Sequence, residues 1–410
     1  MKRMISLIII LAVLLPSPVK ADQEEDFTLS RVIEIALEKN NQLRALASEI
    51  DARGYAYQAS RRLFNPSFEY ELGNAVSYDG TEERNTSGIW LSQYLENPLK
   101  RLYRIRMSES EWQASRFAFG SLSLDVIFEV KRNFYTILML SQKEGLAERN
   151  LESLEQALSL VETRVRLGES RELEAIRLQV EVMRGSNELN SIRTEKLLAR
   201  RILNSLLGES LTTGFSLAGE LTFDPVEADE LALRTRAIQD HPLIGQSQAN
   251  LSAALNNVSY FRSSRIPDPE LSGFMEDELD GRNRGIGISV AVPLWNFRSK
   301  EIAEARSISS QQEYELEALR LKIANQVSFH LGRLRLAEER ILLFQTGLLR
   351  QAEESMSISE TSYREGEISL IDYLDSQRIF YSIQNEYHDA LYEWNLGRAA
   401  LENAIGADLE

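Results

Sequence analysis

The chain has 410 residues, no cysteine and 62 acidic against 46 basic side chains, which gives a formal net charge of −16. This balance disfavours binding to nucleic acid or to anionic surfaces, and it suits a polar, water-filled or cation-attracting surface. Without cysteine we expect neither disulfides nor a lipoprotein acylation site, so stability must come from packing and assembly.

The first 21 residues have the pattern of a secretory signal peptide. Lys2 and Arg3 precede an apolar run over 5–15, and two prolines and the small-residue site at Ala21 follow. The run is shorter than the roughly 20 apolar residues of a membrane-spanning helix. We therefore predict a signal peptide over 1–21 and export of the mature chain. No later segment is apolar for long enough either, so a membrane crossing would require strands.

Two pairs of short segments alternate between apolar and polar or small residues, which is the period of strands with one apolar face. We predict strands over 67–78 with 86–95 and over 270–279 with 285–294. Their lengths fit the roughly 9–11 residues of a tilted transmembrane strand. The positions expected to face the membrane are Phe68, Tyr70, Leu72, Ile286, Ile288, Val290 and Val292. The alternative is a small soluble sheet that caps helices. Four strands cannot close a barrel alone, so the membrane interpretation requires several copies.

Two long proline-free segments, 99–224 and 294–410, are rich in residues that favour helices. Their apolar residues follow a helical period, which taken alone favours antiparallel coiled coils. Each segment has one interruption, at Gly168 in the first and at Gly366 in the second. Because a glycine between two helical patterns is typical of a helix end, we predict that these glycines form the tips of two helical hairpins.

The chain contains one pattern twice. Around the predicted hairpin tips, residues recur at a constant spacing of 198, as with Gly168 and Gly366. The strand regions repeat as well: Pro66 matches Pro267 at a spacing of 201, and Gly88 and Ser92 match Gly285 and Ser289 at a spacing of 197. We predict an internal duplication, with structural repeats over 22–225 and 226–410.

The sequence offers no pattern for catalysis. His241, His330 and His388 are far apart and show no metal-ligand spacing. There is no phosphate-binding loop, nucleophile elbow or zinc signature. We therefore expect no enzymatic activity, no cofactor and no metal site. His241 with Pro242 is better interpreted as a helix break that matches Asn40 in the first repeat.

These features together resemble the outer-membrane efflux protein family, the TolC-like channel-tunnels, over almost the whole mature chain. The resemblance lies in the duplicated order of helices and strands, in "PSF" at Pro66 and "PDPEL" at Pro267, in "GISVAVPLW" over 287–295 and in "YREGEISLIDYLDSQ" over 363–377. It implies a homotrimer whose long helices form an α-barrel continuous with a transmembrane β-barrel of twelve strands, four from each chain. It also implies the outer membrane of a Gram-negative-type bacterium, an α-barrel that extends into the periplasm, a periplasmic adaptor protein and an inner-membrane pump, expected to be of the RND type.

The resemblance also assigns residues to the periplasmic entrance of the tunnel. Asp372 and Asp375 match positions that form acidic rings at the constriction, and Glu174 is the first-repeat equivalent of Asp372. Rings of carboxylates select cations. The alternative is that these acids are solvated residues at a helix start. Tyr363 matches a tyrosine that helps to keep the entrance closed. Ile368 stands where better-known members have a gating arginine, so the closing contacts are expected to differ.

Two other functions remain open at this point. The long helical hairpins also suit a soluble periplasmic coiled-coil adaptor or scaffold, although such a protein would not need a duplicated strand pair of bilayer length. A type I secretion duct is a further alternative within the family. The short C-terminus after Gly406 resembles the branch that serves heavy-metal exporters, but drugs and proteins are equally compatible cargoes.

Overall fold

The computed structural model describes residues 26–211, 215–225 and 227–409. The predicted signal peptide over 1–21 lies outside the described residues. Most of the described chain is helical, with one four-stranded sheet, as the sequence predicted.

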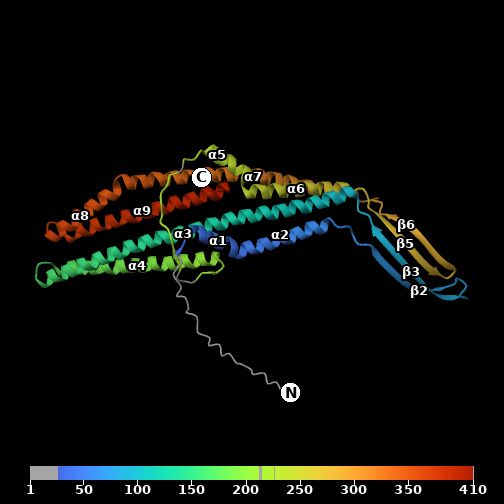
Figure 1. Ribbon diagram of the computed structural model, residues 1–410, viewed down its shortest axis with the longest axis horizontal. Helices are drawn as coiled ribbons and strands as arrows, with labels where there is room; N and C mark the ends of the chain where they lie inside the picture. The colour runs from blue at the N-terminus through green and yellow to red at the C-terminus, as the bar shows by residue number, and fades with distance from the viewer. Residues whose placement is uncertain (1–25, 212–214, 226, 410) are drawn as a thin grey trace, which may run out of the picture.

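The two halves have the same order of elements, namely two helices, two strands and then long helices (Figure 1). The first half contains α1 (Leu29–Lys39), α2 (Asn41–Ser60), β2 (Ser67–Val76), β3 (Glu83–Tyr94), α3 (Pro98–Arg166) and α4 (Glu172–Leu206). The second contains α5 (Glu230–Asp240), α6 (Pro242–Ser263), β5 (Pro269–Glu278), β6 (Gly281–Val290), α7 (Ser299–Leu343), η1 (Phe344–Leu348), α8 (Leu349–Glu365) and α9 (Leu370–Ile405). The short strands β1 (Asp26–Phe27) and β4 (Ser216–Leu217) pair in parallel. The limits of the two repeats, 22–225 and 226–410, stay a prediction.

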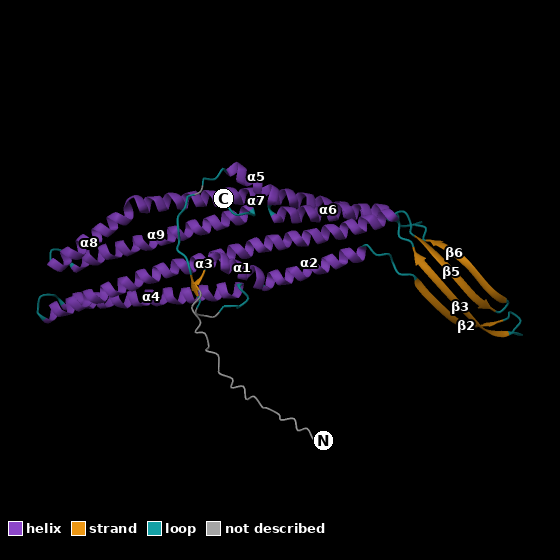
Figure 2. Cartoon of the chain, viewed as in Figure 1, coloured by secondary structure: helices purple, strands orange, loops and turns teal. Residues whose placement is uncertain are grey.

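The long helices form an extended layer with the sheet at one end and two hairpins at the other (Figure 2). The 69 residues of α3 span about 100 Å at 1.5 Å per residue. This helix packs against α4 in the first hairpin, and α8 packs against α9 in the second. Since α6 and α9 lie between α3 and α7, the layer has α2 and α4 along one open edge and α7 and α8 along the other. Among the described helices, none is both long and apolar enough to cross a membrane.

Asn40 and His241 have the same role in the two halves, at the break between the first two helices. The side-chain oxygen of Asn40 accepts hydrogen bonds from the backbone N–H groups of Gln42 (2.9 Å) and Leu43 (3.2 Å). In the second half, Nδ1 of His241 accepts the N–H of Leu243 at 3.1 Å. Burial lowers the pKa of His241, which favours the neutral ring that this cap requires. The predicted helix break is confirmed at both positions.

The second long helix is interrupted where α3 is continuous. One π-helical turn, η1, separates α7 from α8, and the sequence analysis did not predict it. Ile341 and Phe344 point inward three positions apart, whereas Leu348 and Ala352 follow at intervals of four. In a regular packed helix the intervals between inward-facing positions alternate between three and four residues. Two successive intervals of four contain one residue more, and a π turn accommodates this extra residue.

The strands β2, β3, β5 and β6 form one antiparallel sheet in that order. Phe68, Leu91, Gly273 and Ile286 lie opposite one another across it. Because paired residues share a face, the alternation along each strand gathers the apolar residues on one side of the sheet. These residues are Phe68, Tyr70, Leu72, Ile89, Leu91, Leu271, Met275, Ile286, Ile288 and Val290, and all are exposed. This apolar face is thus left open to the surroundings in the single chain.

The limits of β6 differ from the prediction. The strand begins at Gly281 and ends at Val290, four residues before the predicted segment 285–294. Val292 was predicted as a membrane-strand residue and instead lies beyond the strand. The pairing with β5 starts at a tight turn, which draws polar residues into the strand, and Pro293 has no N–H for a sheet hydrogen bond. The other three strands match their predicted limits to within three residues.

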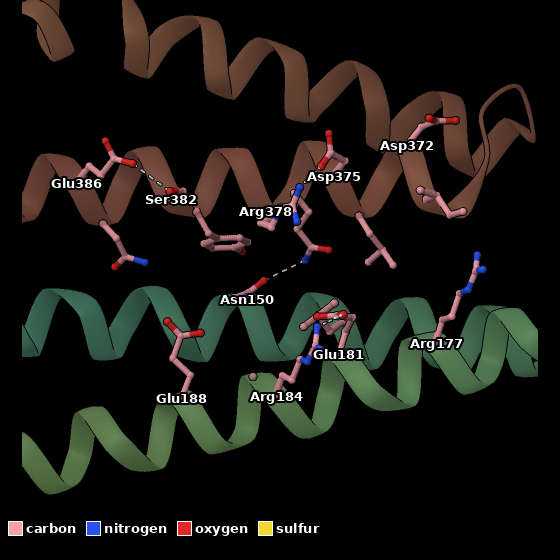
Figure 3. Close-up of a pocket in the computed structure, with 17 residues that line it drawn as sticks. Asn150, Arg177, Glu181, Arg184, Glu188, Asp372, Asp375, Arg378, Ser382 and Glu386 are labelled. Carbon is pink, nitrogen blue, oxygen red and sulfur yellow. Dashed lines mark hydrogen bonds and ion pairs between the residues drawn. The ribbon is translucent and has the colours of Figure 1, made fainter.

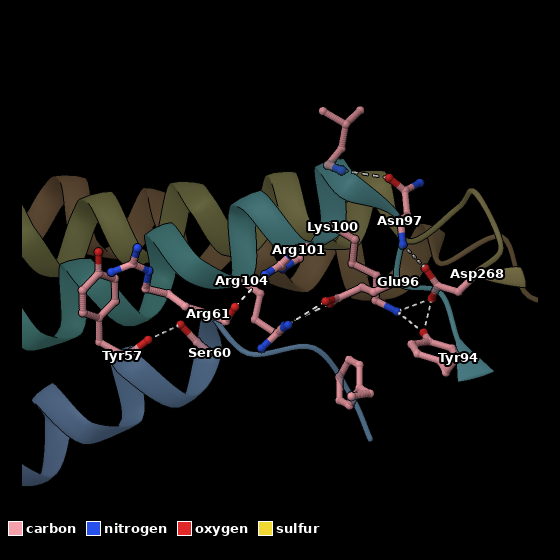
Figure 4. A network of polar contacts seen from close by, with 12 residues as sticks. Tyr57, Ser60, Arg61, Tyr94, Glu96, Asn97, Lys100, Arg101, Arg104 and Asp268 are labelled. Atoms are coloured by element: carbon pink, nitrogen blue, oxygen red, sulfur yellow. Dashed lines mark hydrogen bonds and ion pairs between the residues drawn. The ribbon is translucent and has the colours of Figure 1, made fainter. Parts of the chain in front are cut away.

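A buried carboxylate joins the two halves at the junction between the helices and the sheet (Figure 4). Asp268 lies in the loop between α6 and β5. One of its oxygens accepts the backbone N–H of Asn97 at 2.7 Å, and the other accepts the Lys100 ammonium and the Tyr94 hydroxyl. The side chains of Asp268 and Lys100 are only 10% and 16% exposed. These contacts hold the end of β3 and the start of α3 against the segment that leads into β5.

Candidate functional site

The tips of the two hairpins lie at the end of the molecule opposite the sheet, and both turn at a glycine (Figure 1). Gly168 has φ +77° and Gly366 has φ +81°. After each glycine a backbone N–H reaches back into the helix: that of Glu169 donates to the carbonyl of Arg164, and that of Glu367 donates to the carbonyl of Ser362, each at 2.8 Å. This left-handed helix end strains any residue with a Cβ, which explains the two glycines.

The two hairpins pack on each other next to these turns, on the side that faces the sheet. A cluster of buried side chains joins them, which we call the tip cluster: Leu154, Ala157, Val161, Ala175, Leu178, Tyr363, Leu370 and Tyr373. Its members come from α3, α4, α8 and α9, so both hairpins contribute to it. The second hairpin therefore rests against the first through an apolar contact.

Tyr363 is the member of this cluster that the sequence assigned to the entrance. Its ring stacks on that of Tyr373, with centroids 4.9 Å apart and planes at 12°. Burial raises the pKa of the Tyr363 hydroxyl, and the negative charge of Glu174 raises it further. Glu174, in the first turn of α4, is thus an electrostatic neighbour of Tyr363.

Arg164, from the first hairpin, supplies the cation beside Tyr363. Its guanidinium lies 5.8 Å from the centre of the Tyr363 ring, and its Nη2 donates to the backbone carbonyl of Arg364 at 2.9 Å. Ile368 packs against the apolar tip cluster. Arg171, another arginine at the tips, is exposed at the start of α4. The sequence analysis missed Arg164, because the contact joins residues about 200 positions apart.

Asp372 and Asp375 lie on the first turns of α9 and are exposed. Asp372 completes a capping box: its Oδ2 accepts the backbone N–H of Ser369 at 3.3 Å, and its own N–H donates to the Ser369 hydroxyl oxygen at 3.3 Å. Asp375 forms an ion pair with Arg378, three residues later. Within one chain, both acids therefore have partners on or next to the first turns of α9.

Both acids line a groove of about 850 Å³ between the two hairpins (Figure 3). Charged side chains of both signs line it, namely Arg177, Glu181, Arg184 and Glu188 from α4 and Asp372, Asp375, Arg378 and Glu386 from α9. Its wall is fixed by an amide pair, in which Nε2 of the buried Gln377 donates to Oδ1 of Asn150 at 3.1 Å. The groove is thus lined by both charged and apolar side chains, a mixture that suits contact with another protein.

The histidines do not gather at this site. His330 lies on α7 and His388 on α9, and burial lowers the pKa of both. Within the part of the chain that the structure describes, no three His, Asp or Glu side chains are grouped so as to hold a metal ion.

Comparison with known proteins places this architecture in a family. Residues 32–209 and 233–407 both match the model of the family described as "Outer membrane efflux protein". The two matched segments fall in the two halves of the chain, which agrees with the repeated order of elements.

The chain is also similar to individual proteins over most of its length. Protein CyaE of Bordetella pertussis is 27% identical over 331 residues, which cover 76% of this chain and 69% of that protein. The pyoverdine export outer membrane protein OpmQ of Pseudomonas aeruginosa is 24% identical over 362 residues, covering 85% of this chain and 74% of that protein. Among solved structures, the outer membrane channel CmeC of Campylobacter jejuni has a TM-score of 0.81 at 17% identity, over 93% of this chain and 86% of that one. The structural likeness establishes the fold.

Proposed function

This chain belongs to the outer membrane efflux protein family and is an outer-membrane efflux duct; we propose that it works as a homotrimer that passively conducts cargo across the periplasm and the outer membrane. The observation that carries this proposal is the union of two features in one chain. Helices about 100 Å long end in a sheet whose apolar face is entirely exposed. The first suits a tunnel wall, and the second suits lipid.

The membrane part of the duct is the four-stranded sheet. Three copies supply twelve strands, which close into a barrel without a free edge, and lipid tolerates only such closed sheets. Phe68, Tyr70, Leu72, Ile286 and Ile288 then face the bilayer. The opposite face, with Glu69 and Glu71 on β2, lines the water-filled interior.

The periplasmic entrance lies at the hairpin tips. Threefold repetition of the exposed Asp372 and Asp375 around the axis produces rings of carboxylates that attract cations and repel anions. Glu174 adds a further acid from the first repeat. Arg164 of the first hairpin contacts the Tyr363 ring and the Arg364 carbonyl of the second, so opening of the entrance requires this contact to loosen.

The energy and the cargo come from partners. The open groove between the hairpins and the tips themselves offer polar surface for a periplasmic adaptor, which connects the duct to an inner-membrane pump of the RND type. We propose a small-molecule cargo, because the relative OpmQ is named for pyoverdine export. A strain that lacks this protein should accumulate such cargo, and expression of the chain should reverse the accumulation.

The first test is the oligomeric mass and single-channel conductance of detergent-extracted protein. A trimer with cation-selective conductance in a planar bilayer supports the duct. Recovery from the soluble periplasm as a monomer or dimer without conductance would instead favour a coiled-coil adaptor or scaffold, with the strands as a cap on the helices.

A further inference from the structure

The sheet of one chain has two unpaired edges, and they come from different repeats. β2, from the first half, forms one edge, and β6, from the second half, forms the other. The two repeats already meet inside the chain, where β3 pairs with β5. In this contact the second strand of the first repeat pairs with the first strand of the second repeat. A ring of identical chains can use the same contact a second time, between β6 of one copy and β2 of the next.

The internal pairing offers one alignment of these two edges, although the two hairpins differ by two residues: Glu71 pairs with Gly88, whereas Ser272 pairs with Gly287 and not with Gly285. Ser92 of β3 lies opposite Ser272 of β5. In the repeat, Ser92 corresponds to Ser289 at a spacing of 197, and Ser272 corresponds to Glu71 at a spacing of 201. We propose that β6 pairs with β2 of a neighbouring copy so that Ser289 lies opposite Glu71; the proposal rests on the homotrimeric duct proposed above. One step to either side, Ile288 lies opposite Leu72 and Val290 lies opposite Tyr70.

The course of the apolar band across the sheet supports this register independently. On the apolar face the unbroken band ends at Leu72 on β2, before Asn74, and at Ile286 on β6, before Arg284; Val76 lies beyond this break on β2. Ile286 lies in the row of Phe68, so the band shifts by four residues over three steps between strands. The fourth step leads from β6 to β2 of the next copy, and at the same slope it adds one or two residues to the shift of the band. The total must be even to keep the apolar residues on one face, so it is six.

In the proposed register, Leu72 of the next copy lies opposite Ile288, which is two positions beyond Ile286 along β6. The band therefore shifts by these two residues in addition to the four within the chain, which gives six. At about 3.3 Å per residue and about 4.8 Å between strands, six residues over four strands tilt the strands by about 45°. This value lies at the upper end of the range of about 35–45° that transmembrane barrels adopt. The register is therefore compatible with closure of twelve strands.

The two open edges of the helical layer also come from different repeats. Leu173, Ile176, Val180 and Met183 form an exposed apolar stripe on α4, and Leu321, Leu336 and Leu343 form another on α7. The spacing of three and four residues on α4 and the spacing of seven between Leu336 and Leu343 on α7 are typical of helices that pack against a partner helix. As in the sheet, one edge belongs to the first repeat and the other to the second, so both layers close head to tail around one axis.

Cysteine cross-linking tests the register directly, because the chain has no cysteine of its own. In Ile288→Cys with Leu72→Cys, each copy carries one cysteine on each edge. Oxidation in outer membranes should convert most of the protein to a covalent trimer on a non-reducing gel, since opposed residues have the separation of a disulfide. The matched controls are Ile288→Cys with Tyr70→Cys and Ile288→Cys with Asn74→Cys. Their diagonal separation of about 7–8 Å is too large for a disulfide, so they should stay mostly monomeric.

A second pair on the other face, Ser289→Cys with Glu71→Cys, guards against unfavourable disulfide geometry on one face. The proposal holds if either opposed pair gives the covalent trimer and the shifted pairs do not. It is overturned if a shifted pair cross-links best, or if no pair cross-links in a protein that is still a conducting trimer. A monomer without conductance would contradict the proposed function itself and not only the register.

Discussion

Replacement of Asp268 by alanine should weaken the junction between the helices and the sheet more than any surface change. The carboxylate accepts the Lys100 ammonium, the Tyr94 hydroxyl and the Asn97 N–H in a setting that is 10% exposed. Its removal leaves the Lys100 ammonium, 16% exposed, without its partner. Loss of one member of a buried ion pair costs about 3–5 kcal/mol, so we expect the free energy of unfolding to fall by about that amount per chain.

The assay is urea unfolding of the detergent-extracted protein, followed by tryptophan fluorescence at fixed protein concentration, because the stability of an oligomer depends on concentration. The matched control is Glu181→Ala, which breaks the exposed Arg184–Glu181 pair and should cost less than about 1 kcal/mol. If Lys100→Met is added to Asp268→Ala, part of the loss should return, since no unpaired buried charge remains. Equal losses in Asp268→Ala and Glu181→Ala would refute the reasoning.

The same carboxylate predicts a pH dependence. Burial alone would raise the pKa of Asp268, but the hydrogen bonds from Lys100 and Tyr94 outweigh it and hold the pKa below the ordinary 3.8. A group whose pKa is lower in the folded state binds fewer protons there than in the unfolded state. Its contribution to stability is therefore complete above about pH 4 and is lost as the pH falls through the folded pKa. Asp268→Asn should remove this acid-dependent part while the protein stays less stable throughout.

Three further changes test the entrance, the tips and the membrane face. Asp372→Asn with Asp375→Asn should reduce cation selectivity and block by multivalent cations in a planar bilayer; unchanged selectivity would mean that these acids do not line the constriction. Gly366→Ala should destabilise by about 1–2 kcal/mol in the same urea assay, because its φ is +81°. Ile288→Arg should cost about 2–4 kcal/mol if it lies near the bilayer midplane and should lower the trimer yield in outer-membrane fractions, while arginine one position along, on the opposite face, should be tolerated.

The parts of the fold that the sequence predicted are those set by local rules. Proline-free stretches predicted the long helices, and Gly168 and Gly366 stand where a left-handed helix end requires glycine. Alternation placed the apolar residues of β2 and most of β6 correctly. Each of these signals depends on a few neighbouring residues, so one sequence was enough to detect it.

The errors arose where partners distant in sequence decide the outcome. The start of β6 is set by its pairing with β5, which extends the strand into a polar segment and leaves Val292 outside. The π turn at Phe344 depends on which side of α7 and α8 is buried against other helices. The residue count between inward positions contained this signal, but the inward positions are known only once the packing is known.

The entrance shows the same limit at the level of single contacts. A motif match identified Tyr363, and the match failed at Ile368, where the expected arginine is missing. The structure places the guanidinium of Arg164 against the Tyr363 ring from the other hairpin. The cation beside this tyrosine thus comes from the first hairpin. If this contact holds the entrance closed, Arg164→Met should increase conductance, whereas Arg171→Met, on an exposed residue at the same tip, should not.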